Sequence, residues 1–150
     1  MPFEPSDPSW ESRVRTSFAR QPMMATIGAV LERVAPGEAD VRLPFREAIS
    51  QHHGFVHAGA LTTAVDTACG YAALSLMPPG AGVLSIEFKV SLLAPGKGES
   101  ILARGWVVKP GRNVTFCQGE VFAVDRGAAK LVATMSATMA VVQGRPDVVD

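Results

Sequence analysis

Hydrophobic and polar positions alternate strictly in one stretch of the second half of the chain. From position 84 to 92, large apolar residues take every second place, and Ser, Glu and Lys take the places between them. A period of two is typical of a β-strand with one buried side. Three further strand-like runs follow, bounded by short turns, so the predicted strands cover 84–92, 101–109, 113–125 and 130–142. Because turns connect them, we expect each strand to pair antiparallel with the next.

The first half of the chain contains a helical period. Three apolar residues spaced four apart predict a short amphipathic helix that ends at Pro22, namely Trp10, Val14 and Phe18. Two strand-like runs follow over 25–34 and 39–45, and the turn-forming pair Pro36-Gly37 joins them as a hairpin.

A long run of small apolar residues from His57 to Met77 predicts the principal helix, which Pro78 and Pro79 end. The order of elements is therefore helix, hairpin, long helix and four strands. A helix rich in Ala and Gly lets a sheet approach it closely. We predict an α+β fold in which a curved antiparallel sheet of five to six strands wraps the central helix.

Length and composition narrow the class of protein. The 150 residues fit one domain, with 1–22 as a helical extension and 144–150 as a tail. Lys plus Arg and Asp plus Glu number 14 each, and this zero net charge argues against nucleic acid as a partner. Asp66 interrupts the longest apolar run and the first residues lack a signal peptide, so we expect a cytoplasmic protein without a membrane partner.

Asp66 is the one carboxylate within the long helix, and small apolar residues surround it in sequence. Burial raises the pKa of a carboxyl group, which suits a general base or a nucleophile. A structural alternative is that Thr62, Thr63 or a neighbouring backbone group satisfies the carboxylate. The catalytic interpretation of Asp66 is favoured, because the first turn of the same helix is expected to bind an anion.

The start of this helix, at His57, Ala58 and Gly59, is predicted to present free backbone N–H groups and the positive end of the helix dipole. Such an end binds a phosphate or the oxyanion of an acyl intermediate. Ala58 and Asp66 are eight residues apart, about 12 Å along a helix, so one carbonyl group cannot contact both. A shared site must combine Ala58 of one chain with Asp66 of another, which predicts a homodimer.

The other candidates for chemistry are three histidines and a thiol. His52, His53 and His57 lack carboxylate or thiol partners at the spacing of a zinc site, so no metal is expected. His52 and His53 are expected in a loop that shapes the site. Cys69 is interpreted as a small buried hydrophobe rather than a nucleophile.

Three segments together resemble the hotdog-fold acyl-CoA thioesterases, in particular their phenylacetate-degradation branch. These segments are Gly54-Phe55-Val56-His57-Ala58-Gly59, Val65-Asp66-Thr67-Ala68 and Leu84-Ser85-Ile86-Glu87-Phe88-Lys89-Val90. The resemblance covers about residues 25–142. It implies hydrolysis of an acyl-CoA or aryl-CoA thioester to the free acid and coenzyme A. It also implies a homodimer that often pairs into a homotetramer, with no metal and no separate cofactor.

The resemblance implies roles for single residues. Asp66 would activate water or attack the thioester, and the Ala58 N–H would polarise the thioester carbonyl. The Gln51 amide would be a second carbonyl donor, and Ser85 would orient the water. Two positions depart from the family pattern, because His-Ala-Gly replaces the usual His-Gly-Gly and Gln51 replaces a common Asn.

In this family the coenzyme A phosphates lie on the surface across a subunit interface. The candidates to bind them are Lys89, Arg104, Lys109 and Arg112. Arg112 is favoured, because it lies beside Asn113 in a turn where backbone N–H groups and a guanidinium can meet a phosphate together. His52 is expected beside the substrate.

Two other functions stay open. Hotdog hydroxyacyl dehydratases pair a loop histidine with a helix carboxylate, and the spacing of His52 and Asp66 resembles that pair. The proline-rich segment that those enzymes carry between the two residues is absent here. A non-catalytic acyl-CoA binding domain would share the fold without turnover.

Overall fold

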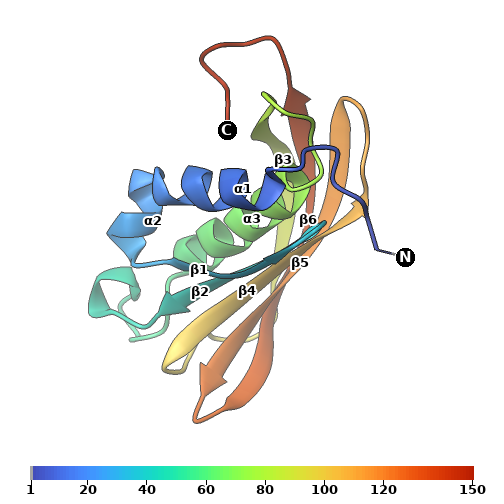
Figure 1. The fold of residues 1–150 in the computed structure, drawn as a ribbon. Helices are drawn as coiled ribbons and strands as arrows, with labels where there is room; N and C mark the ends of the chain where they lie inside the picture. The colour runs from blue at the N-terminus through green and yellow to red at the C-terminus, as the bar shows by residue number, and fades with distance from the viewer. Residues whose placement is uncertain (1) are drawn as a thin grey trace.

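A computed structural model describes residues 2–150 as three α-helices and a six-stranded antiparallel sheet. Figure 1 shows the α-helices on one side of the curved sheet. In chain order the elements are α1 (Trp10–Ala19), α2 (Pro22–Ile27), β1 (Val30–Ala35), β2 (Glu38–Pro44), the 3-10 helix η1 (Glu47–Ile49), α3 (Ala58–Leu74), β3 (Gly82–Leu92), β4 (Ser100–Lys109), β5 (Val114–Asp125) and β6 (Ala128–Val142). The predicted α+β hotdog architecture is confirmed.

The strand order is β1-β2-β4-β5-β6-β3. The prediction that β3 pairs with β4 was wrong, because β3 pairs with β6 from Gly82 opposite Val142 to Leu92 opposite Ala133. The connection between β3 and β4 is too long for a tight turn, and it crosses the helix start, where Val56 bridges Gly96. As a result β4 pairs with β2, and β3 lies at a free edge of the sheet.

The N-terminal segment contains a second helix that the apolar pattern did not predict. Pro22 begins α2 instead of ending the helical segment, because proline suits the first helical turn. Gly28 ends α2 with a φ of 75°, in the left-handed region that glycine favours. The strand expected from Ala25 therefore begins only at Val30.

Two glycines of the sheet let α3 pack closely against it, Gly105 against the helix backbone and Gly119 against its side chains. A Cβ on Gly105 of β4 would lie 2.5 Å from the Ala68 carbonyl carbon and the Cys69 nitrogen. A Cβ on Gly119 of β5 would lie 2.5 Å from Val65 Cγ2. The sheet can approach this closely because α3 presents small, fully buried residues such as Ala68 to it. This contact fixes the position of the helix that carries Asp66.

Arg13 of α1 holds the other end of α3. Its guanidinium donates hydrogen bonds to the carbonyl oxygens of Leu74, Met77 and Pro78 at 3.0, 2.7 and 2.7 Å. The Leu74 and Pro78 carbonyls also accept the N–H groups of Met77 and Ala81, at 3.0 and 3.2 Å, whereas within residues 2–150 the Met77 carbonyl accepts from Arg13 alone. Asp7 lies 3.4 Å from Arg13 Nε and completes the ion pair.

Candidate active site

Asp66 lies in the middle of α3 and its carboxylate faces the start of β3. The Ser85 hydroxyl donates a hydrogen bond of 2.8 Å to Asp66 Oδ1. Burial raises the pKa of Asp66 above its ordinary value, and the Ser85 hydrogen bond acts against that rise. Thr62 and Thr63 do not satisfy the carboxylate, because their hydroxyls donate to the carbonyls of Ala58 and Gly59, both at 2.8 Å. The two threonine side chains that the structural interpretation of Asp66 named therefore do not contact its carboxylate.

A β-bulge at Ile86 aims Ser85 at the helix. Ser85 pairs with Met139 and Glu87 with Thr138, so the register shifts by one residue between them. Met139 belongs to the core side of the sheet. Ser85 therefore faces α3, whereas strict alternation placed it with the polar residues on the opposite side. The alternation predicted over 84–92 is wrong at this point, because a bulge reverses the sides of the residues that precede it.

The start of α3 has one backbone donor without a protein partner. His57 is the N-cap residue, and its Nδ1 accepts the Gly59 N–H at 2.8 Å. The N–H groups of Ala60 and Leu61 donate to the His57 carbonyl. Among residues 2–150, no group accepts from the Ala58 N–H. His57 and Gly59 therefore form the cap, and Ala58 provides the N–H that an oxyanion can use.

The orientation of the Gln51 side chain follows from two backbone hydrogen bonds. Its Oε1 accepts the N–H groups of His53 and Phe55. Because the carbonyl oxygen is held in this way, the amide NH₂ group points away from the loop. Within the described residues it donates to no protein atom, and Gln51 lines the same pocket as Ala58. Both donors therefore belong to residues that line one pocket.

This pocket, which we call the helix-start pocket, measures about 730 Å³. It is lined by the loop before α3, the first turns of α3 and the segment after β3, with His52 at its rim: Gln51, His52, Phe55, Val56, His57, Ala58, Leu61, Leu92, Leu93, Ala94, Pro95 and Gly96. Asp66 does not line it. Asp66 and Ser85 line a second pocket of about 130 Å³, together with Gln21, Thr67, Gly70, Tyr71, Val83 and Asp150. One chain thus places the carboxylate and the free N–H in separate pockets, as the helical spacing predicts.

The remaining candidates lie elsewhere. Lys89 is exposed and lines a hollow formed by residues of β3 to β6. Arg112 and Asn113 are exposed in the turn between β4 and β5, and line neither pocket of the site. The exposed His52 ring lies against His53, with centroids 3.9 Å apart and planes tilted by 44°, and does not share a pocket with Asp66. One chain therefore does not bring these residues to the carboxylate.

The two cysteines are not nucleophiles at neutral pH. Both are free and buried. Burial raises the pKa of Cys69 well above its ordinary value and raises the pKa of Cys117 to about 12. A thiol must lose its proton to attack, so both side chains act as packing groups.

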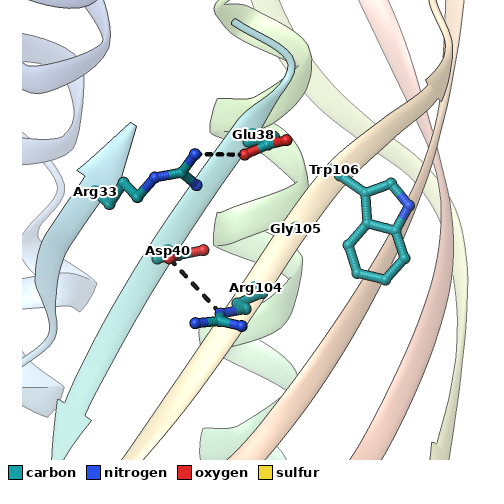
Figure 2. A pocket seen from close by; sticks show the side chains of 6 residues that line it. All are labelled: Arg33, Glu38, Asp40, Arg104, Gly105 and Trp106. Carbon is teal, nitrogen blue, oxygen red and sulfur yellow. Dashed lines mark hydrogen bonds and ion pairs between the residues drawn. The ribbon is translucent and has the colours of Figure 1, made fainter. Parts of the chain in front are cut away.

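A charged hollow of about 340 Å³ lies on the side of the sheet away from α3 (Figure 2). Its charges already have partners, because Arg104 lies 3.7 Å from Asp40, and Arg33 lies 2.7 Å from Glu38. Burial raises the pKa of Asp40, and the charge of Arg104 opposes the rise. A ligand phosphate would have to displace a carboxylate to bind here.

The pocket around Asp66 contains two residues that the sequence did not single out. Gln21 precedes α2, and Asp150 lies in the segment predicted to be a tail. That segment folds back, so that Asp150 Oδ2 accepts the Val83 N–H at 2.9 Å. No local pattern distinguishes either residue. Across residues 2–150, no three metal-ligating side chains converge, and no helix is long and apolar enough to span a membrane.

Comparison with known proteins gives a consistent result. The family model described as the thioesterase superfamily matches residues 53–130. A crystal structure of a thioesterase family protein from Silicibacter pomeroyi is 46% identical, with a TM-score of 0.88 over 90% of this chain and 99% of that one. The phenylacetic acid degradation protein PaaI of Thermus thermophilus, solved as a mutant, is 28% identical, with a TM-score of 0.70 over 81% of this chain and 100% of that one.

A Halobacterium salinarum protein with a provisional esterase name is 34% identical over 97 residues. The match covers 61% of this chain and 64% of that protein, so the chain matches less than two thirds of its length. Together with the family model and the solved structures, these likenesses confirm the resemblance that the sequence motifs indicated.

Proposed function

This chain belongs to the thioesterase superfamily, and from that premise we propose that it hydrolyses an acyl-CoA or aryl-CoA thioester to the free acid and coenzyme A. The observation that carries the proposal is the Asp66 carboxylate, whose pKa burial raises and whose Oδ1 is held by Ser85 in a pocket of its own. A carboxylate of raised pKa accepts a proton more readily near neutral pH, as a general base must.

In the proposed reaction, water attacks the thioester carbonyl carbon and its proton passes to Asp66. The carbonyl oxygen becomes an oxyanion that accepts from the Ala58 N–H and the Gln51 amide. Collapse of this intermediate breaks the C–S bond, and the departing thiolate takes the proton from Asp66. In the alternative route Asp66 attacks the carbonyl carbon, the C–S bond breaks and coenzyme A leaves as the thiolate, and water then hydrolyses the mixed anhydride and restores the carboxylate.

Two copies of the chain are proposed to complete each site. Support comes from the separation of Asp66 from the Ala58 pocket and from the free edge of β3. This edge strand and the residue after it expose large apolar side chains that a second copy would cover: Leu84, Ile86, Phe88, Leu92 and Leu93. An unpaired, apolar edge favours strand addition. We propose a homodimer, with the homotetramer as a dimer of dimers.

The helix-start pocket is proposed to receive the coenzyme A arm, because it is wide and has apolar walls beside the free Ala58 N–H. In the dimer, the surface residues Lys89, Arg112 and Asn113 are proposed to contact the phosphates. The reaction as written uses neither a metal nor a separate cofactor. A cytoplasmic location is proposed because both thiols are free.

The test is release of free thiol from a panel of acyl-CoA and aryl-CoA esters by wild type and the Asp66→Asn variant. General-base catalysis is worth about 10²–10⁴-fold, so we expect kcat to fall by that factor while substrate still binds. The matched control is Asp40→Asn. Burial raises the pKa of Asp40 as well, but Asp40 lies on the side of the sheet away from α3, so its replacement should leave turnover unchanged.

Loss of the fold does not explain the expected loss of activity. The folded-state pKa of Asp66 is raised, so ionisation of its carboxyl destabilises the fold as the pH rises through that pKa. At neutral pH the Asn variant should therefore unfold at no lower a temperature than wild type. Wild type that binds acyl-CoA but releases no thiol would contradict the proposal and indicate a binding domain. Dehydration abolished by His52→Ala would indicate a dehydratase.

A further inference from the structure

The pocket beside Asp66 extends along α3 and β3 away from the carboxylate. On α3 it runs from Asp66 to Gly70, a rise of about 6 Å. On β3 it runs from Ser85 back to Val83, a span of about 7 Å. Asp150 lies at the Val83 end, where it accepts the Val83 N–H. The pocket therefore has the reacting carboxylate at one end and the carboxylate of Asp150 at the other.

Gly70 leaves this pocket open. A Cβ on Gly70 would meet no atom of the chain within 4 Å, although Gly in a helix interior costs about 1 kcal/mol relative to Ala. This absence of contacts sets Gly70 apart from Gly105 and Gly119, which the packing of α3 against the sheet requires. Within one chain, the bare face of Gly70 provides space beside Asp66 and serves no packing need.

The far end of the pocket is polar, and its hydrogen bonds have a defined direction. The Ser17 hydroxyl donates its one proton to Asp150 Oδ1 at 2.6 Å, so in the 3.1 Å contact between Ser17 and Tyr71 the Tyr71 hydroxyl must donate. Tyr71 in turn accepts from Gln21 Nε2 at 2.7 Å. The hydroxyls of Tyr71 and Ser17 have thus used their protons within the protein.

The hydrogen-bonding capacity that remains at this end consists mainly of acceptors. Gln21 Oε1 has no partner among the described residues, and the Asp150 carboxylate keeps lone pairs beyond the bonds from Ser17 and Val83. A hydroxyl group on a ligand could donate to either. A second carboxylate on a ligand would be repelled by both Asp150 and Asp66.

We infer that this pocket is the acyl subsite, and that it selects a short acyl group with a hydrogen-bond donor, such as a hydroxyl, at its far end. The inference rests on the proposed thioesterase function and names the substrate class of the same site. The volume of this pocket, about 130 Å³, is small beside the 730 Å³ of the helix-start pocket, which limits the chain beyond the carbonyl carbon. Gly70 sets the length of the group, and Gln21 and Asp150 recognise its end.

The first experiment measures kcat/KM by thiol release for a series of coenzyme A esters. The length series is acetyl, butanoyl, hexanoyl and octanoyl. At constant length, butanoyl is compared with 4-hydroxybutanoyl and succinyl. One methylene in excess of a pocket costs about 10–200-fold, so we expect octanoyl to be turned over at least 100-fold less well than butanoyl. We expect 4-hydroxybutanoyl to exceed butanoyl about tenfold, the value of one hydrogen bond, and succinyl to be the poorest of the three.

The second experiment uses variants that narrow or neutralise the subsite. Gly70→Ala should lower the ratio of butanoyl-CoA to acetyl-CoA turnover by about tenfold or more. Gln21→Leu should abolish the preference for 4-hydroxybutanoyl over butanoyl. Both readouts are ratios between substrates on one variant, so a purely structural effect, which lowers all rates together, does not change them.

Two results would overturn the inference while leaving the proposed function intact. One is octanoyl turnover as fast as that of butanoyl in wild type. The other is a Gly70→Ala variant that slows every ester by the same factor. If wild type released thiol from no ester at all, the proposed function would itself fail, and the acyl subsite with it.

Discussion

Replacing Gly105 with Ala tests the backbone contact that positions α3. The added Cβ would lie 2.5 Å from the Ala68 carbonyl carbon and the Cys69 nitrogen, about 1 Å inside the usual carbon contact of about 3.5–4.0 Å. These atoms belong to helix backbone, so the helix or the strand must move as a whole. Overpacking costs about 1–3 kcal/mol, and the reduced entropy of the unfolded chain returns about 0.4–1 kcal/mol. We expect a net loss of about 1–1.5 kcal/mol in the free energy of unfolding.

Thermal and urea unfolding provide the measurement. For a domain of this size about 1 kcal/mol corresponds to about 2–4 °C, so the melting temperature should fall by about 2–6 °C. The control is the same substitution at Gly70, where a Cβ has free space. There the gain in helix propensity should stabilise the protein by about 0.8–1 kcal/mol. The two Gly→Ala changes should thus differ in sign.

The same movement should affect catalysis. If α3 moves away from the sheet by about 1 Å, Asp66 loses its alignment with Ser85, and misplacement of that size costs about 100-fold in rate. The reasoning would be refuted if Gly105→Ala unfolded at the wild-type temperature with full turnover. A Gly70→Ala variant less stable than wild type would equally contradict the account of the two glycines.

Two further predictions concern a hydroxyl and a guanidinium. Ser85→Ala removes the hydrogen bond that lowers the pKa of Asp66, so that pKa should rise. The base works in its ionised form, and the rate falls as the pH falls through this pKa. The acid limb of kcat/KM against pH should therefore move to higher pH. A limb that stays in place would show that Asp66 is not the titrating group. Arg13→Met leaves the Met77 carbonyl without a donor and Asp7 without its ion-pair partner, and should lower the free energy of unfolding by about 3 kcal/mol in urea. The exposed Arg15→Met on the same helix should cost about 0.5 kcal/mol or less, and equal losses would refute the capping role.

Local periodicity was sufficient to predict most elements of this fold. The long helix and the last three strands lie close to their predicted bounds, because small-residue runs, alternation and Pro-Gly turns act over a few residues. The position of β3 could not be predicted in this way. Its pairing with β6 is decided by contacts far apart in sequence, and the antiparallel rule for neighbouring strands fails where a connection is long. Pro22 was ambiguous, because proline both ends helices and begins them.

The candidate site was predictable to the extent that one helix carries it. Asp66 and Ala58 share α3, so their residue types and spacing already indicated two half-sites. Gln21 and Asp150 were missed, because they come from opposite ends of the chain and meet only in the folded molecule. The free amide of Gln51 likewise depends on backbone bonds within its loop, which residue type alone does not reveal.

The bulge in β3 has a consequence for how this segment tolerates changes in length. Residues after Ile86 keep regular pairing with β6, and those before it are shifted by one. Removal of Ile86 would leave Ser85 opposite Met139 and keep every later pair, because the bulge holds the one residue that has no partner on β6. Loss of the bulge with Ile86 retained would instead turn Ser85 to the outer side of the sheet, so the hydroxyl tolerates a shorter segment better than a regularised one.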